Sequence, residues 1–319
     1  MFKLNIVPQN TKVNFVGYRR FAYPLSALLI ILSIGAFLTQ GLNFGIDFRG
    51  GILIEIKTEG PADVEQLRRD VGGLGLGEVQ IQEFGAPDDI LIRVQQQDGE
   101  EKEQVKAIET IKNALGDSVA EYRRTEFVGP TVGAELISSA IWAVALAIGA
   151  ILIYIWFRFE WQFGVGAVIA LTHDVITTIG LFAFTQLEFN LATVAAILTI
   201  AGYSINDTVV IYDRVREELR RYKKMDLAEL LNMAANRTLS RTFMTSVTTL
   251  IALIALAVFG GTIIRDFALA MIWGVIIGTY SSVFIALPVL LGLKLSRESL
   301  SATGPEEDTE GDANAPRDD

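Results

Sequence analysis

The stretch Phe189–Tyr212, FNLATVAAILTIAGYSINDTVVIY, is long and apolar enough to cross a membrane, yet it contains a carboxylate. A helix needs about 20 predominantly apolar residues to span a hydrocarbon core about 30 Å thick. Asp207 lies in the polar part of this stretch, Gly202–Thr208. A charge at the membrane centre costs about 2.5–3.5 kcal/mol on insertion scales, and such residues belong to ion or proton pathways or pair with another charge. The stretch therefore predicts both a membrane-spanning helix and a functional site.

The composition of the 319-residue chain is that of an integral membrane protein, and it excludes several kinds of site. Hydrophobic residues make up 51% of the chain and gather in long runs. The absence of cysteine excludes disulfides and thiolate chemistry, and a single histidine cannot build a zinc site alone. The formal net charge of −10 argues against nucleic-acid binding. We expect no metal site, no cofactor and no enzymatic activity.

Five further apolar runs predict that the chain crosses the membrane six times. The expected spans are Phe21–Leu38, Leu136–Phe157, Trp161–Phe184, Phe189–Tyr212, Phe243–Phe259 and Phe267–Leu293. We therefore expect a cytoplasmic N-terminus (1–20), a first helix (21–40), an extracytoplasmic domain (41–134), helices two to four (135–213), a basic cytoplasmic loop (214–242), helices five and six (243–293) and an acidic, disordered tail (294–319).

Basic residues near the ends of the expected spans predict the orientation of the chain. With alternating helices they fall on one side of the membrane, and the opposite short loops carry only Arg265. The positive-inside rule then places both termini in the cytoplasm. We expect the chain to lie in the cell inner membrane. Within the basic loop, Leu227–Ala235 fits a helix on the membrane surface. The residues that set the orientation are Lys3, Lys12, Arg19, Arg20, Arg158, Arg214, Arg216, Arg220, Arg221, Lys223, Lys224, Arg237, Arg241, Lys294 and Arg297.

The extracytoplasmic segment has the pattern of a small α+β domain. Alternating apolar residues predict strands over 51–57, 78–84, 90–94 and 121–128, and helical periodicity predicts helices over 61–74 and 100–115. The order β-α-β-β-α-β indicates a ferredoxin-like sandwich, a fold that does not by itself define a function. We expect a hairpin turn at Ala86–Asp89 and helix core faces made of Val64, Leu67 and Val71, and of Val105, Ile108, Ile111 and Leu115.

A glycine-rich junction, Gly45–Gly51, connects the first span to the first strand. The pair Gly50 and Gly51 permits positive φ angles or a close approach of backbone. We interpret the junction mainly as a tight structural turn, in which Asp47 and Arg49 could pair locally.

Polar side chains of spans four and five are expected to meet near the cytoplasmic end of the bundle. Residues three and four apart share a helix face, so the sequence predicts two stripes: Ala196, Thr199, Tyr203, Asn206 and Asp207, and Arg241, Thr245, Thr248 and Thr249. Low dielectric favours a neutral carboxyl group, whereas a nearby arginine favours the charged form. Asp207 paired with Arg241 could therefore load and release a proton, or the pair could be a static clamp between two helices.

A second intramembrane carboxylate, Asp174, lies near the middle of span three beside His173. Thr177 and Thr178 follow one turn later and could hydrogen-bond to it. Two roles stay open for Asp174, a proton relay or a satisfied contact between helices, and we expect His173 to be a packed core residue. Small residues repeat every four positions at Gly274, Gly278 and Ser282 and predict close helix packing.

Taken together, these motifs resemble the SecF subunit family of the bacterial protein-export machinery, part of the resistance-nodulation-division superfamily. The resemblance covers about residues 10–297 and rests on five motifs: Gly45–Gly51, Val128–Gly133, Thr172–Asp174, Gly202–Thr208 and Asn236–Thr242. It implies a SecD partner subunit, association with the SecY-SecE-SecG channel, and use of the proton gradient to help pull unfolded preproteins across the membrane. It also implies that Asp207 and Arg241 belong to the proton path.

Three other functions are compatible with parts of the sequence. A proton-coupled small-molecule exporter of the same superfamily would need larger extracytoplasmic domains than this chain has. An intramembrane aspartyl protease could use Asp174 and Asp207 as its catalytic pair, but no Gly-x-Gly-Asp motif occurs on any expected span. A purely structural stabiliser of a partner subunit would not depend on Asp207.

Overall fold

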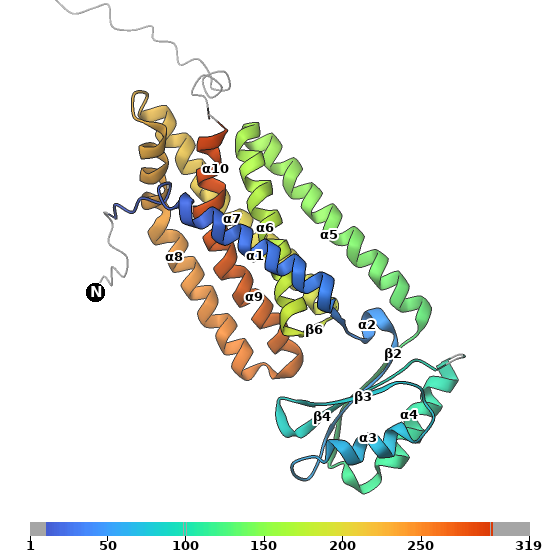
Figure 1. The fold of residues 1–319 in the computed structure, drawn as a ribbon. Helices are drawn as coiled ribbons and strands as arrows, with labels where there is room; N and C mark the ends of the chain where they lie inside the picture. The colour runs from blue at the N-terminus through green and yellow to red at the C-terminus, as the bar shows by residue number, and fades with distance from the viewer. Residues whose placement is uncertain (1–10, 98, 100, 294, 296–319) are drawn as a thin grey trace, which may run out of the picture.

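The computed structural model describes residues 11–97, 99, 101–293 and 295 of the chain. A helical bundle and a small α/β domain lie at opposite ends of an elongated molecule (Figure 1). Six apolar helical segments in the described residues are long enough to cross a membrane, as the sequence predicts. Apart from Leu295, the expected tail lies outside the described residues, as do Lys3, Lys294 and Arg297.

The bundle helices agree with the expected spans but several of them extend further. Their bounds are α1 Arg19–Gln40, α5 Pro130–Arg158, α6 Trp161–Thr185, α7 Leu191–Arg221, α8 Leu227–Phe259, α9 Gly261–Ser281 and α10 Leu287–Gly292. The sixth span is one path through α9, a π-helical turn η2 (Ser282–Ala286) and α10. Pro288 follows this turn and lacks a backbone N–H, so regular α-helical hydrogen bonding cannot continue through it.

The segment 214–242, expected to be a loop, is mostly helical. Helix α7 continues to Arg221, and α8 begins at Leu227, where the Asp226 side chain accepts hydrogen bonds from the next turn. The expected surface helix is the first part of α8, which runs without interruption into the membrane span. No proline or glycine occurs in its 33 residues, so nothing breaks the helix. At about 1.5 Å per residue it is ~50 Å long, more than a ~30 Å hydrocarbon core requires.

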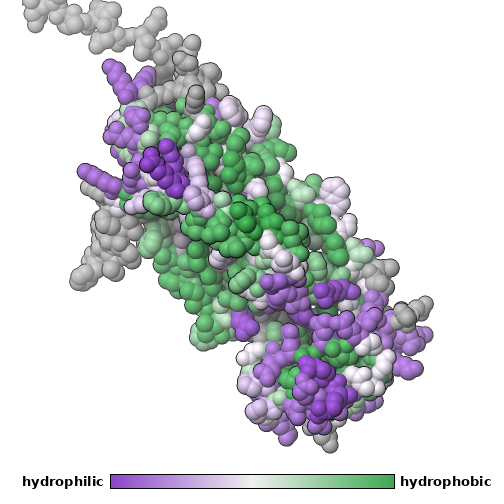
Figure 2. Space-filling model, in the orientation of Figure 1, coloured by the Kyte–Doolittle hydropathy of each residue, from purple (hydrophilic) through white to green (hydrophobic). Residues whose placement is uncertain are grey.

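Three spans form the interior of the bundle and three lie outside. In the most apolar windows of α6, α7 and the α9–α10 span, 56%, 50% and 67% of the residues are buried, against 11%, 0% and 17% in α1, α5 and α8. Helix α5 leans away from its neighbours toward the soluble domain (Figure 1). The exposed apolar side chains of the outer helices form the broad hydrophobic surface above the polar domain in Figure 2.

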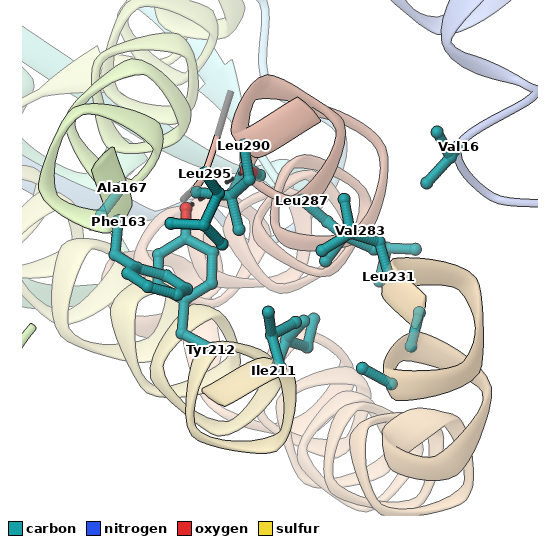
Figure 3. Close-up of a cluster of buried hydrophobic side chains, with 14 of the residues drawn as sticks. Val16, Phe163, Ala167, Ile211, Tyr212, Leu231, Val283, Leu287, Leu290 and Leu295 are labelled. Atoms are coloured by element: carbon teal, nitrogen blue, oxygen red, sulfur yellow. Dashed lines mark hydrogen bonds between the residues drawn. The ribbon is translucent and has the colours of Figure 1, made fainter. Parts of the chain in front are cut away.

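A buried apolar cluster closes the end of the bundle farthest from the soluble domain. Figure 3 shows Tyr212 beside Phe163, with Leu287 and Leu290 above them. The rings of Phe163 and Tyr212 meet edge-on with centroids 4.9 Å apart, a favoured aromatic geometry. The Tyr212 hydroxyl donates to the carbonyl oxygen of Ala286, 3.2 Å away, in the π-helical turn. The irregular turn is thus fixed against α7.

Glycines allow close approach between spans where the sequence predicts it. A Cβ atom at Gly274 would overlap the side chain of Ile200 on α7, and one at Gly278 would lie 3.0 Å from the Cβ of Ser204. Gly180 on α6 packs directly against Ser33 of α1.

The soluble domain has the expected element order. It comprises β2 Gly51–Lys57, α3 Val64–Gly72, β3 Val79–Phe84, β4 Ala86–Val94, α4 Glu101–Leu115, the 3-10 turn η1 Gly116–Ser118 and β5 Glu121–Val128. The four strands form an antiparallel sheet in the order β3-β4-β2-β5. Apolar residues of one sheet face and of both helices, among them Ile54, Ile92, Leu67 and Ile111, form its core.

Two details of this domain differ from the prediction. Residues Ala86–Asp89 belong to strand β4 rather than to a turn, because Gly85, with φ +94°, makes the reversal alone. On α4, Val105 is 43% exposed, whereas Gln104 and Ala107 are buried with Ile111. The Gln104 side chain both donates to and accepts from the backbone of residue 97, which turns this face of the helix inward.

The contact between α1 and α6 gives a first prediction. A Cβ atom at Gly180 would lie 2.6 Å from the Cα atom of Ser33, so Gly180→Ala must separate the two helices. We expect a lower unfolding temperature in detergent, measured by circular dichroism. Gly35→Ala is the control on α1, because nothing lies within 4 Å of its added methyl group. This control should be neutral or slightly stabilising, since alanine favours a helix over glycine by about 0.5–1 kcal/mol. Equal melting of both variants would contradict the packing described.

Candidate functional site

Asp174 is the most enclosed charged group of the bundle interior. Its side chain is fully buried, and its Oδ2 atom accepts hydrogen bonds from the hydroxyls of Ser204 (2.6 Å) and Ser281 (2.7 Å). Nδ1 of His173 lies 3.0 Å from Oδ1. The carboxyl group therefore connects α6, α7 and α9, the three inner helices.

The neighbours of Asp174 differ in part from the prediction. The hydroxyls of Thr177 and Thr178 donate to the backbone carbonyl of Asp174, at 3.2 and 2.7 Å, and not to its carboxyl group. This back-bonding is the ordinary alternative for threonine within a helix. His173 is buried, as expected of a packed core residue, and its ring lies 6.0 Å from that of Tyr280. The serines that hold Asp174 come from other helices.

Asp207 is also buried but has fewer partners. Its side chain is 3% exposed, and Oδ2 has no hydrogen-bond partner. The side chain of Thr279 faces this carboxyl group, and the positive charge of Arg241 is near enough to interact with it electrostatically. Arg241 itself is exposed, and no ion pair joins it to Asp207 in the part of the chain that the structure describes. The arrangement described here therefore contains no direct Asp207–Arg241 ion pair of the kind that a static clamp would need.

Several hydroxyl groups lie around Asp207 at the same height in the bundle. Tyr203 donates to Ser246 (3.4 Å), and Ser246 lies 2.8 Å from the hydroxyl of Thr279, which faces Asp207. On the other side of α7, the hydroxyls of Thr208 and Ser282 are 2.7 Å apart. Ser204, the partner of Asp174, precedes Asp207 by one turn, a rise of about 4.5 Å along the helix. Both carboxyl groups therefore belong to one hydroxyl-rich layer.

Sequence reasoning missed part of this layer. The threonines expected to face Asp207 from α8 instead back-bond, Thr245 to the carbonyl of Arg241 and Thr248 to that of Met244. Ser246, between them, makes the interhelical contact. On the sixth span, the sequence pattern predicts Ser282 only as a small packing residue and does not single out Thr279 or Ser281. The four consecutive hydroxyl-bearing residues of this span, Thr279–Ser282, are a sequence signal from which these groups could be found.

The expected stripe on α7 divides between two faces. Ala196 and Asp207 are buried, whereas Thr199 and Asn206 are exposed on the outside of the bundle. Asn206, although part of the same motif, thus does not share the surroundings of Asp207.

The glycine-rich junction contacts the start of α7. Residues 46–49 form a short helix, α2 (Ile46–Arg49), in which Asp47 does not pair with Arg49. Instead, Oδ2 of Asp47 accepts a hydrogen bond from the backbone N–H of Leu191, the first residue of α7, at 2.9 Å. The two side chains diverge because α2 directs Asp47 toward the bundle and leaves Arg49 exposed.

The paired glycines are required by the backbone. Gly50 and Gly51 have φ angles of +71° and +115°. A Cβ atom at Gly51 would lie 2.6 Å from the carbonyl oxygen of Val94 in the neighbouring strand. Gly45 packs under the side chain of Glu188, which leaves no room for a side chain there either.

A second charged cluster lies at the end of the bundle farthest from the soluble domain. Glu218 is fully buried on α7 and pairs with Arg214 (2.8 Å) and with Arg237 of α8. Asp213 pairs with Arg158 at 2.8 Å on a half-exposed surface. We call this end, with Arg158, Arg214 and Arg237, the basic end. Among the described residues no group of three or more His, Asp or Glu side chains could hold a metal ion.

The hydrogen bonds of Asp174 give a second prediction. Asp174→Ala leaves two buried serine hydroxyls without their acceptor, at a cost of about 1–3 kcal/mol for each unsatisfied group. Asp174→Asn keeps an oxygen for both serines and an amide beside His173. We therefore expect the alanine variant to unfold at a clearly lower temperature in detergent and the asparagine variant to stay near the unsubstituted protein. Equal losses would show that the negative charge, and not the hydrogen bonding, stabilises the site.

The tight turn at Gly51 gives a third prediction. Gly51→Ala places a methyl group against the Val94 carbonyl and strains a positive φ angle, so the soluble domain should lose stability. Gly60→Ala is the matched control, because nothing lies within 4 Å of that position and its φ is unstrained. Limited proteolysis of the soluble domain should cleave only the Gly51 variant faster.

Comparison with known proteins gives a consistent result. A family model described as protein export membrane protein SecD/SecF, C-terminal, matches residues 107–296, and one of the SecD/SecF GG motif matches residues 35–62. The protein translocase subunit SecF of Rickettsia bellii is 46% identical over 296 residues, 91% of this chain and 96% of that protein. The SecF of Cereibacter sphaeroides is 45% identical over 317 residues, 97% of this chain and 96% of that protein.

Solved structures agree with these relatives. The crystal structure of SecDF from Thermus thermophilus, described as a translocon-associated membrane protein, superposes with a TM-score of 0.81 at 37% identity; the match covers 90% of this chain and 39% of that one. A SecDF in a super-membrane-facing form gives 0.66 at 35% identity, over 92% and 40%. The expected resemblance is thereby confirmed, and the chain belongs to the SecF family of protein translocase subunits.

Proposed function

We propose that this chain uses the proton motive force, together with a SecD subunit, to assist late stages of preprotein translocation through the SecY-SecE-SecG channel. The observation that carries the proposal is the Asp207 carboxyl group, which is buried at membrane depth with one oxygen free of hydrogen bonds. Intramembrane carboxylates of this kind are a feature of proton-coupled pumps and transporters. No cofactor is needed, since the coupling ion is the proton.

The surroundings of Asp207 support reversible protonation. A carboxyl group without an ion pair can gain or lose a proton without first breaking one. Arg241 acts on Asp207 electrostatically from α8. We infer two arrangements, one in which Arg241 approaches the ionised carboxylate and one, as described here, in which it lies outside. A charge crossing 100 mV gains about 2.3 kcal/mol, enough to shift an equilibrium between two such arrangements by roughly fiftyfold.

The outer surface of the spans supports a membrane partner. Thr199 and Asn206 are exposed on α7 within an apolar span, and Arg241 is exposed on α8. Polar groups in a membrane face a protein interior or a water-filled cavity rather than lipid. Spans of a SecD subunit placed against α7 and α8 would cover these residues. The solved relatives are SecDF chains, and this chain matches only about two-fifths of each. The SecD part of such a chain would correspond to the partner proposed here.

The charge distribution supports the proposed orientation. The basic end of the bundle is opposite the soluble domain (Figure 1). By the positive-inside rule the basic end and both termini face the cytoplasm of a cell inner membrane, and the soluble domain faces the preprotein as it leaves the channel.

Replacement of Asp207 tests the proposal. Inverted vesicles carrying this chain, its SecD partner and the SecY-SecE-SecG channel would translocate a radiolabelled preprotein with and without a proton gradient. In Asp207→Asn we expect the gradient-stimulated part of translocation to disappear, because the side chain can no longer exchange a proton. Asp213→Asn is the matched control, because it removes the same charge from the same helix at the half-exposed basic end.

Two outcomes would overturn the proposal. Gradient stimulation that persists in Asp207→Asn at normal protein levels would leave the chain as a structural stabiliser of its partner. Equal loss in Asp207→Asn and Asp213→Asn, with normal assembly of both, would show that general electrostatics of α7 and not proton exchange is being measured.

A further inference from the structure

Two segments that are far apart in the sequence form one packed unit between the bundle and the soluble domain. Strand β1 (Asn43–Phe44) pairs in parallel with β6 (Glu188–Phe189), which connects α6 to α7. The N–H of Gly45 donates to the carbonyl of Phe189 at 2.9 Å. We call residues 43–49 and 186–191 together the α7 joint.

The α7 joint has an apolar core of its own. The rings of Phe44, Phe48 and Phe189 lie with their centroids 5.8–5.9 Å apart, and Phe182 at the end of α6 lies 5.7 Å from Phe189. Aromatic pairs at this spacing stabilise a contact beyond the effect of their buried area. The rings of Phe44, Phe48 and Phe189 therefore hold the two segments of the α7 joint together, and Phe182 connects them to the end of α6.

Asp47 fastens the junction to α7 itself. The first N–H groups of a helix have no partner within the helix and carry its positive dipole end. Asn190 and Thr193 form a capping box that satisfies two groups here. The N–H of Leu191 is instead bound by Asp47, which comes from 144 positions earlier in the chain.

The soluble domain is attached to the same place by a largely, though not fully, buried ion pair. Arg93, in strand β4, pairs with Glu188 of β6, and their side chains are only 12% and 15% exposed. Removal of one partner of a buried pair leaves an uncompensated charge. The sheet, the junction and the start of α7 are thus connected through adjacent residues, 188–191.

We propose that the α7 joint makes the soluble domain move as one body with the domain end of α7, and that Asp47 and Glu188 are the positioning residues of this coupling. The inference rests on the proposed function, in which the proton acts at Asp207. Helix α7 is continuous from Leu191 to Arg221 and contains no proline. Asp207 lies 16 residues from its start, about 24 Å along the axis. A shift of α7 at Asp207 therefore reaches the soluble domain through these contacts.

Substitutions at Asp47 test the coupling in the full complex. In Asp47→Ala we expect the gradient-stimulated part of translocation to fall about fivefold, which corresponds to the ~1 kcal/mol of a lost hydrogen bond. Asp47→Asn keeps an acceptor for Leu191 and should retain the stimulation. Asp63→Ala is the matched control, because Asp63 caps α3 within the soluble domain through a 2.9 Å bond to Gln66 and has no contact with α7.

A distance measurement separates coupling from stability. The chain has no cysteine, so Glu109→Cys on α4 and Ala195→Cys on the exposed face of the first turns of α7 provide unique spin-label sites. We expect one narrow distance distribution that a proton gradient does not change, and a broad one when Asp47→Ala is added. A distance that changes with the gradient in the unsubstituted background would overturn the rigid joint.

The outcomes distinguish the inference from the proposed function. If Asp207→Asn abolishes stimulation while Asp47→Ala retains it fully, the α7 joint is not the transmission path although the proton motor stands. If Asp207→Asn retains stimulation, the proposed function itself fails, whatever the Asp47 variants do. Loss in Asp47→Ala and Asp63→Ala alike would show a general effect of destabilising the soluble domain and would also overturn the inference.

Discussion

The packing of the inner helices depends on one constraint: polar side chains buried in the bundle must find hydrogen-bond partners within the protein. Both oxygens of Asp174 have such partners: one accepts hydrogen bonds from serine hydroxyls of α7 and α9, and the other lies beside the His173 ring. Because these partners lie on three different helices, the same hydrogen bonds that make the carboxylate tolerable also fix how the inner helices are positioned. The outer helices α1, α5 and α8 then pack on this frame with far less of their surface buried.

Asp207 lies in the same layer under different conditions. Its carboxyl group lacks a full set of hydrogen-bond donors, because one of its oxygens has no partner. Two carboxyl groups about one helical turn apart in level therefore differ in their partners: Asp174 has three hydrogen-bonding neighbours, whereas one oxygen of Asp207 has none. The difference arises from which hydroxyls reach each group, not from the type of residue.

Helix α7 connects the features that matter for function. Its first N–H is bound by Asp47 of the glycine-rich junction, its middle carries Ser204 and Asp207, and its last turns carry the buried Glu218, paired with α8. Events at either end of the membrane thus act on one continuous helix. The ion pair of Arg93 with Glu188 extends the connection to the sheet of the soluble domain.

The sequence by itself determined the six spans, the element order of the soluble domain and the identity of Asp174 and Asp207 as unusual groups, because hydropathy, periodicity and charge at membrane depth are local properties. It did not determine that α7 and α8 extend into the basic segment, since charge alone cannot tell a loop from an exposed helix. Only the tertiary structure decided which partners these groups have. Tertiary contacts across 72 to 144 positions of the chain bring Ser281 to Asp174, Thr279 to Asp207 and the N–H of Leu191 to Asp47. The fold also leaves Arg241 exposed on α8. Contacts of that range depend on the whole fold, which no local pattern encodes.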